Sequence, residues 1–146
     1  DFARKQINLK KVTCVTTQRV PQHILYSFVE QISSLSSLIE FQLFLYKSVI
    51  KWTREWSLSL MISNIECLCI VCSELDIEQD CNQPYLRNTK LTRFAVRVKT
   101  SDPPQIKNIR NLLVTFPNLE DLCISHLDNV GLIWISQRLV KITIEY

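Results

Sequence analysis

Ile65-Glu66-Cys67-Leu68-Cys69-Ile70 is the stretch that decides the fold, because its pattern of apolar positions returns along the chain. A large apolar residue is followed after two residues by a second one, and after one more residue by a third. The other copies are 38–43, 91–96, 119–124 and 139–144, with a weaker copy at Ile7 and Leu9. The middle apolar positions (7, 41, 68, 94, 122 and 142) have numbers that differ in turn by 34, 27, 26, 28 and 20. Three nearly equal intervals predict a structural repeat of about five to six units.

Each copy alternates apolar and other residues, which predicts a β-strand. Between the strands, residues 21–37 carry apolar side chains at helical spacing, and we also predict helices over 48–62, over 102–116 and from Asp128 onward. The segment 73–90 is polar and contains Pro84, so we predict an irregular loop there. Strands that are joined by such crossovers must run parallel.

Polar residues stand between the apolar ones inside the predicted strands, and Glu40, Arg93 and Asp121 are examples. A doubly wound sheet is buried on both faces and needs nearly continuous apolar strands. We therefore predict an α/β fold in which a curved, one-sided parallel sheet forms a solenoid with its helices on the convex side. A doubly wound sheet is the alternative.

The composition narrows the classes of function. The 146 residues contain a single glycine, Gly131, which excludes glycine-rich phosphate loops and nucleophile elbows. A net charge of +3 does not favour nucleic-acid binding, and no apolar run approaches the about 20 residues of a membrane span. The six cysteines lie mostly in apolar strands, so we expect free thiols in a reduced intracellular protein of the cytoplasm or nucleus. Because the first residue is Asp1, we expect a fragment or processed form of a longer chain.

The motif spacing, with three successive intervals between 26 and 28 and a helix in most units, resembles leucine-rich repeats of the ribonuclease-inhibitor type. The phrase Phe116-Pro-Asn-Leu-Glu-Asp-Leu122 is similar to repeats of F-box leucine-rich-repeat proteins. The resemblance implies one repeat domain over residues 1–146, whose concave strand face binds a protein. The F-box family further implies a substrate receptor of a ubiquitin ligase.

The chain departs from the family in two ways: the asparagine or cysteine expected after the motif is absent, and no segment resembles an F-box. We therefore expect flanking domains in the parent chain.

Alternation along each strand predicts which side chains face the partner. The predicted concave-face residues are Glu40, Gln42, Phe44, Cys67, Cys69, Val71, Arg93, Arg97, Lys99, Asp121, Cys123, Ser125, Lys141 and Thr143. Gln6, Asn8 and Lys10 take the same positions in the weak first copy. The strip is mixed in charge, with an apolar centre and a basic step at 93–99, and a partner with an apolar anchor and an acidic contact would fit it.

We predict no enzyme, no cofactor and no metal site. Cys67, Cys69, Cys72 and Cys81 could supply thiolates for zinc, but paired Cys-x-x-Cys knuckles are absent and two of the four belong to the repeat pattern. The predicted function is a protein–protein interaction module, such as the recognition part of an F-box ubiquitin-ligase receptor. The alternatives are the repeat region of an immune-receptor-type or scaffold protein, and a small α/β enzyme with a doubly wound sheet.

Overall fold

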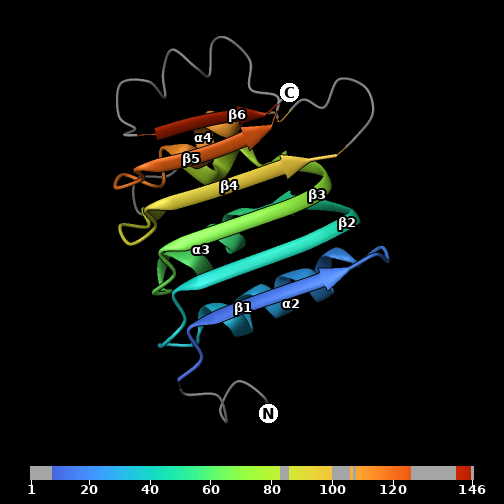
Figure 1. Cartoon of the computed structure of the whole chain (residues 1–146), viewed down its shortest axis with the longest axis horizontal. Coiled ribbons are helices and arrows are strands. Elements are labelled where there is room, and N and C mark those ends of the chain that lie inside the picture. Colours follow the sequence, from blue (N-terminus) through green and yellow to red (C-terminus); the bar gives the residue numbers. More distant parts are fainter. Residues whose placement is uncertain (1–7, 83–85, 100–105, 107, 126–140, 146) are drawn as a thin grey trace.

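The computed structural model describes residues 8–82, 86–99, 106, 108–125 and 141–145. Its main feature is one sheet of six parallel strands, which lie side by side in the order of the sequence (Figure 1). The strands are β1 (Lys11–Thr16), β2 (Glu40–Trp52), β3 (Cys67–Ile77), β4 (Arg93–Val98), β5 (Asp121–Ser125) and β6 (Lys141–Glu145). The predicted α/β class with a parallel sheet is confirmed.

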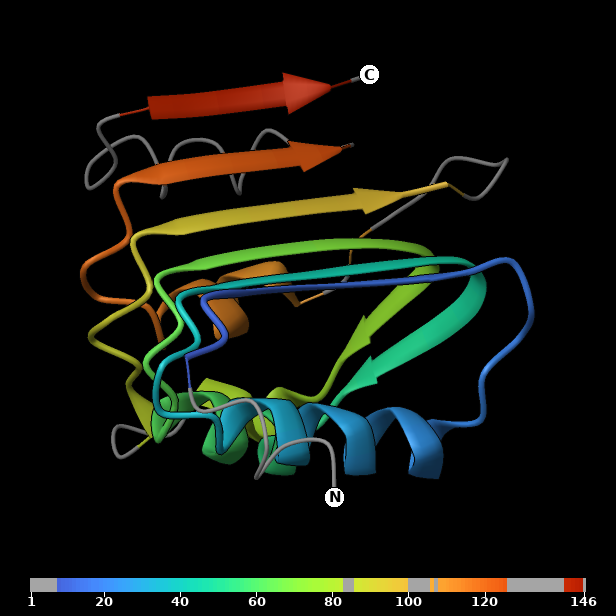
Figure 2. The ribbon, with the colours of Figure 1, turned by 60° about the horizontal axis from the view of Figure 1, so that its bottom comes forward.

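The described helices all lie on the same face of this sheet (Figure 2). They are α2 (Gln22–Ser33), α3 (Arg54–Met61), the 3-10 helix η1 (Gln79–Asn82) and α4 (Ile109–Leu113). A doubly wound sheet reverses its strand order at a switch point, and helices then cover both faces. The strand order of this sheet has no reversal, which argues against the doubly wound alternative.

The strand register gives the repeat its physical meaning. Successive register partners across the sheet are Val12, Phe41, Leu68, Phe94, Leu122 and Ile142, whose numbers differ in turn by 29, 27, 26, 28 and 20. The last four intervals equal those predicted. The first copy was wrongly placed at Ile7 and Leu9, because Lys10 and Lys11 made the true strand look polar. The motif of β1 is Leu9, Val12 and Cys14, and its outward residues are Lys11, Thr13 and Val15 rather than Gln6, Asn8 and Lys10.

β2 and β3 are longer than the repeat pattern predicts, with 13 and 11 residues. Their register shifts between Leu45 and Val49, and beyond this bulge both strands bend toward the helices (Figure 2). The predicted helix over 48–62 was therefore too long, because its first residues are strand and α3 begins only at Arg54. The predicted loop over 73–90 likewise begins as strand and continues as η1. The apolar spacing in 49–60 fits both periods, and packing against the helix layer selects the strand for its first part.

The structure describes the other predicted helices to different extents. α2 confirms the helix predicted over 21–37 for its larger part, but it begins after Pro21 and already ends at Ser33. Of the predicted helix over 102–116, the structure describes Ile109–Leu113 as α4, while residues 102–105 lie outside the described part. The helix predicted from Asp128 onward also lies outside the described residues.

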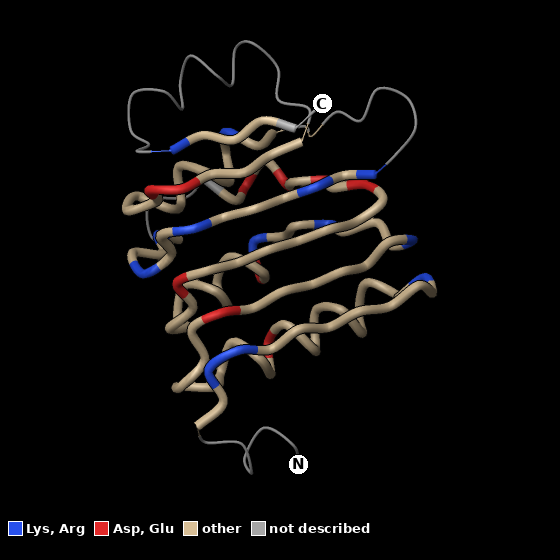
Figure 3. The backbone as a smooth tube through the Cα atoms, in the orientation of Figure 1, with Lys and Arg blue, Asp and Glu red and all other residues tan. Residues whose placement is uncertain are grey.

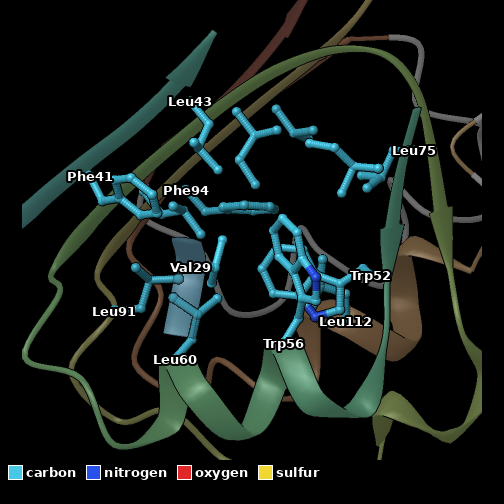
Figure 4. Packing of buried hydrophobic residues seen from close by; sticks show 14 of the residues in the cluster. Val29, Phe41, Leu43, Trp52, Trp56, Leu60, Leu75, Leu91, Phe94 and Leu112 are labelled. Carbon is cyan, nitrogen blue, oxygen red and sulfur yellow. The ribbon is translucent and has the colours of Figure 1, made fainter. Parts of the chain in front are cut away.

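The core fills the space between the sheet and the helices and is centred on aromatic rings (Figure 4). The ring of Trp52, at the end of β2, lies 5.4 Å from that of Trp56 and 6.3 Å from that of Phe94, measured between centroids. Its indole Nε1 donates to Ser57 Oγ at 2.9 Å, so the polar atom of this buried ring is satisfied. The bend of β2 thus places its last residue in the centre of the core.

Polar side chains directly before the repeat motif connect neighbouring units. The hydrogen bonds are Ser37 Oγ to the carbonyl of Leu9 (2.9 Å), Asn64 Nδ2 to that of Ser36 (2.8 Å) and Asn118 Nδ2 to that of Thr89 (2.8 Å). These positions follow the period of the sheet, so the bonds recur at the amino ends of the strands. They satisfy loop carbonyls that the strand ladder leaves without a partner.

Candidate functional site: the open face of the sheet

The strand face opposite the described helices is called here the open face. Its side chains form lateral rows, because parallel strands align residue by residue. The charged row consists of the register partners Lys11, Glu40, Cys67, Arg93, Asp121 and Lys141. The small row consists of Thr13, Gln42, Cys69, Ala95, Cys123 and Thr143. The apolar row consists of Val15, Phe44 and Val71, followed on β4 by Arg97. The sheet therefore brings the predicted residues together in an ordered array (Figures 1 and 3).

The charged row crosses the amino ends of the strands, and its charges alternate in sign (Figure 3). Lys11 Nζ lies 3.1 Å from Glu40 Oε1, and the same oxygen accepts from Gln42 Nε2 at 2.7 Å. Thr13 Oγ1 in turn donates to Gln42 Oε1 at 3.1 Å. At the β1–β2 end, the polar groups of the open face are thus already paired with one another.

The thiols of the open face are held neutral by their surroundings. Burial raises the pKa of Cys67 and that of Cys69, although the nearby Arg93 and Arg97 guanidiniums each lower one of them. Cys69 and Cys123 are both register partners of Ala95, so they lie two strand spacings apart, about 9–10 Å. This separation exceeds the about 7 Å limit for a disulfide without backbone movement. Free thiols follow at these positions.

The four cysteines weighed as zinc ligands do not converge. Cys67 and Cys69 lie on the open face, whereas Cys72 and Cys81 belong to the buried core. Cys81 Sγ donates to the carbonyl of Trp52 at 3.4 Å, inside the helix layer. Within the described part of the chain, no group of three or more histidine, cysteine, aspartate or glutamate residues is placed to hold a metal ion.

Apolar side chains gather at the end of β1 and directly before the bends of β2 and β3. This apolar patch consists of Val15, Phe44, Tyr46 and Val71. The rings of Phe44 and Tyr46 stack at 6.4 Å between centroids with an interplanar angle of 19°. Lys99 Nζ lies 4.9 Å from the centroid of the Tyr46 ring, a cation–π contact that crosses from the end of β4 to β2. An aromatic surface with a cation at its rim is the most chemically distinctive part of the open face.

Sequence reasoning missed two residues of this patch. Val15 was missed because the first strand was placed too early, although the spacing Leu9, Val12, Cys14 carries the signal for the correct register. Tyr46 continues the alternation of Gln42 and Phe44 by one more step, so extending the predicted strand past its motif would have included it.

Two predicted face residues are covered rather than exposed. Val71 is 4% exposed beneath its neighbours, and Ser125 is 5% exposed. Ser125 Oγ accepts from the backbone N–H of Val98 at 2.8 Å, which satisfies a donor at the end of β4. Arg93, Arg97, Lys99 and Lys141 are exposed, and Thr143 is half-buried. Apart from Val71 and Ser125, the predicted face is therefore accessible, because its other residues are exposed or half-buried.

The helix side carries a separate pocket of about 270 Å³ between the amino ends of α2 and α3. Tyr26, Lys51 and Trp56 line it together with Gln22 and its neighbours. The Gln22 amide is used within the fold, because its Nε2 donates to the carbonyl of Val49 and its Oε1 accepts from the N–H of Lys51. His23 also lines the pocket, whereas His126, the other histidine of the chain, lies outside the described residues.

Comparisons with protein-family models, with curated proteins and with solved structures found no match to this chain. Among the helices of the described residues, none has the length and apolar character that would let it cross a membrane.

Proposed function

We propose that the chain is a segment of a divergent leucine-rich-repeat solenoid whose open face binds another protein. One observation carries the proposal: a parallel sheet in strict sequence order has its described helices on one face, while the other face carries rows of mixed side chains. In solenoids, each unit buries one strand face against its own helix and leaves the other for a partner. The regular spacing of the register partners from β1 to β5, in steps of 29, 27, 26 and 28 along the chain, supports a repeat origin.

The narrower form of this proposal is the recognition part of an F-box ubiquitin-ligase receptor. Its support is the phrase from Phe116 to Leu122, in which Leu119 and Leu122 pack into the core and Asn118 bonds to the preceding unit. The test is a pull-down of the parent protein with a ligase adaptor and a cullin. Absence of both partners rejects the F-box form. A nucleotide-binding domain found in the parent protein would instead favour the regulatory region of an immune receptor.

The cysteines support a reducing, intracellular location. All six are free, and Cys72 and Cys81 are buried in the core as small apolar side chains. The spacing of Cys69 and Cys123 also leaves these two thiols unbridged. Such a set of thiols suits the cytoplasm or the nucleus, where disulfides are rare.

The binding face is tested by site-specific photo-crosslinking in the parent protein. A photo-reactive phenylalanine analogue replaces Ala95, at the middle of the small row, and in a matched control it replaces Ser27, an exposed residue of α2. We expect protein adducts from position 95 and a much weaker yield from position 27. Adducts from position 27 alone, or from neither position, would reject the open face as the binding surface.

A further inference from the structure

We propose that the apolar patch and Lys99 form a docking site for an extended peptide segment with one large apolar residue and an acidic residue within three positions of it. This inference rests on the proposed function, because it names the kind of partner that the open face would take. It concerns only the part of the open face around the apolar patch.

The patch differs from other exposed apolar residues by being clustered. Among the described residues, the large apolar side chains that are clearly exposed are Val15, Ile24, Ile39, Tyr46 and Ile62. Of these, Val15 at 60% and Tyr46 at 39% exposure lie on either side of the half-buried Phe44, the register partner of Val15, while Val71 is covered at 4%. Single exposed apolar residues are normal, whereas a contiguous patch with polar surroundings is typical of an interaction site.

The stacked rings provide a surface for an anchor. Phe44 and Tyr46 stack with nearly parallel rings, and together with Val15, the register partner of Phe44, they form an apolar wall. Aromatic residues contribute a large apolar area with few rotatable bonds, which is why they dominate binding hot spots. A large aliphatic or aromatic side chain laid against this wall would remove apolar surface of both partners from water.

The positive charge beside the apolar patch indicates the second feature of the partner peptide, which is its acidic residue. Lys99 holds its ammonium group over the Tyr46 ring, and among the described residues no carboxylate lies within salt-bridge distance of it. Arg97 is the register partner of Val71 and places a second cation beside the patch (Figure 3). A carboxylate of the partner is the complement of the Lys99 ammonium group.

Among the described acidic residues of the sheet, Glu145 lies at the carboxyl end of β6, and the others lie away from the apolar patch. Glu40 belongs to the charged row at the opposite end of β2, where Lys11 already neutralises it at 3.1 Å. Asp121 belongs to the same row. Glu74 and Asp76 follow the bend of β3, where the strand has turned toward the helices. Over β1 to β4, the open face thus carries charges of both signs at the amino ends of the strands and cations beside the aromatic rings of the apolar patch.

The strand geometry sets the spacing within the partner. Phe44 on β2 and Arg97 on β4 are two strand spacings apart, about 9–10 Å. An extended peptide rises about 3.3 Å per residue. A residue about three positions before or after an anchor over Phe44 therefore reaches the end of β4, where an acidic side chain can approach Lys99.

The test uses random twelve-residue peptides displayed on phage and selected on the full-length protein. We expect enriched peptides to pair a large apolar residue with Asp or Glu within three positions. A representative labelled peptide should bind the Lys99→Glu variant at least about tenfold more weakly, as expected for reversing one charge of a close pair. Lys141→Glu is the matched control at the other end of the face, and its affinity should stay within about twofold of the wild type.

Several outcomes would overturn the inference. These are the absence of enriched peptides, enrichment of basic peptides, or equal binding to the wild type and to Lys99→Glu. Sedimentation that reveals a dimer lost in Phe44→Ser would identify a second copy as the occupant, and this also overturns it. Any of these results together with crosslinks from position 95 would leave the proposed function standing. The same results without such crosslinks would remove both.

Discussion

Successive residues along each strand belong to opposite faces of the sheet: the inner face, which packs against the helices, and the open face. On the inner face, the row Val12, Phe41, Leu68, Phe94, Leu122 and Ile142 is apolar throughout, and its four central members are at most 1% exposed. The residues one position earlier in each strand form the charged row of the open face, and the type of side chain changes from each strand to the next. The inner row repeats because each unit must fill the same space against the helices. None of the described helices packs on the open face, so the variation of its residues is available for recognition.

The largest expected difference between the faces concerns two aromatic residues of β2. Trp52 is fully buried and contacts other aromatic rings of the core, whereas Phe44 lies on the open face. Trp52→Ala should lower the free energy of unfolding by about 3–5 kcal/mol, because it leaves a cavity that the core cannot close. Phe44→Ala, the matched control, should cost less than about 1.5 kcal/mol. Urea unfolding measures both, and equal losses would mean that Phe44 belongs to the core.

Thiol reactivity separates the same two faces. Burial raises the pKa of Cys72 to about 12 and that of Cys81 to about 11, so few thiolates form there at neutral pH. Cys67 and Cys69 also have raised pKa values but are half-exposed on the open face. With iodoacetamide at pH 8, we expect Cys72 and Cys81 to react at least about tenfold more slowly than these two, because their thiolates are rarer and both side chains are buried. Peptide mass spectrometry over time gives the order, and early labelling of Cys72 would contradict it.

The raised pKa of Cys72 also makes stability depend on pH. The folded state favours the protonated thiol, so this contribution is fully present below the unfolded pKa of about 8.5 and is lost as pH rises toward about 12. The free energy of unfolding should fall by up to about 1.4 kcal/mol per pH unit for this thiol. Cys72→Ala should show a shallower decline between pH 9 and pH 11 than the wild type. An unchanged slope would show that Cys72 ionises freely in the folded protein.

The inner face was also the part of the fold that could be predicted. The positions of β2, β3, β4 and β5 follow from an apolar pattern that packing repeats at each unit. The first strand was misplaced because Leu9, Val12 and Cys14 are only partly buried, and a half-exposed strand tolerates the lysines that hide its pattern. The bend after Leu45 could not be predicted, since it depends on docking Ile50 and Trp52 against distant helices.

Alternation predicts which residues lie on the open face, but it does not predict which of them are covered or contact one another. Alternation places Arg93, Cys69 and Phe44 correctly, because parallel register is a geometric consequence of the repeat. Alternation alone does not reveal that Ser125 is covered and accepts a backbone hydrogen bond. The contact between Lys99 and Tyr46 was equally hidden, since it joins residues on β2 and at the end of β4.

A smaller effect is expected from polar residues that connect the units. The buried Asn88 donates from Nδ2 to the carbonyl of Leu60 at 2.9 Å, and its Oδ1 accepts from the N–H groups of Lys90 and Leu91 at 3.0 and 3.2 Å. Asn88→Ala should cost about 1–3 kcal/mol, because it leaves buried backbone groups unsatisfied. Asn118→Ala, the control, removes one bond of an exposed side chain and should cost less than about 1 kcal/mol. If Asn118→Ala lowered stability more than Asn88→Ala in thermal unfolding, burial would not decide how much these hydrogen bonds contribute.

The smallest expected effect belongs to the charged row. Lys11 and Glu40 form an ion pair at 3.1 Å, but their side chains are 53% and 32% exposed. Water and salt screen such a pair, and Lys11 must also lose side-chain freedom to form it. A double-mutant cycle with Lys11→Ala and Glu40→Ala should therefore give a coupling of about 0–1 kcal/mol that shrinks at high salt. A coupling well above that range for exposed pairs would mean that the row holds the sheet together. Its residues would then be constrained by stability, like those of the inner face, and would be less free to serve recognition.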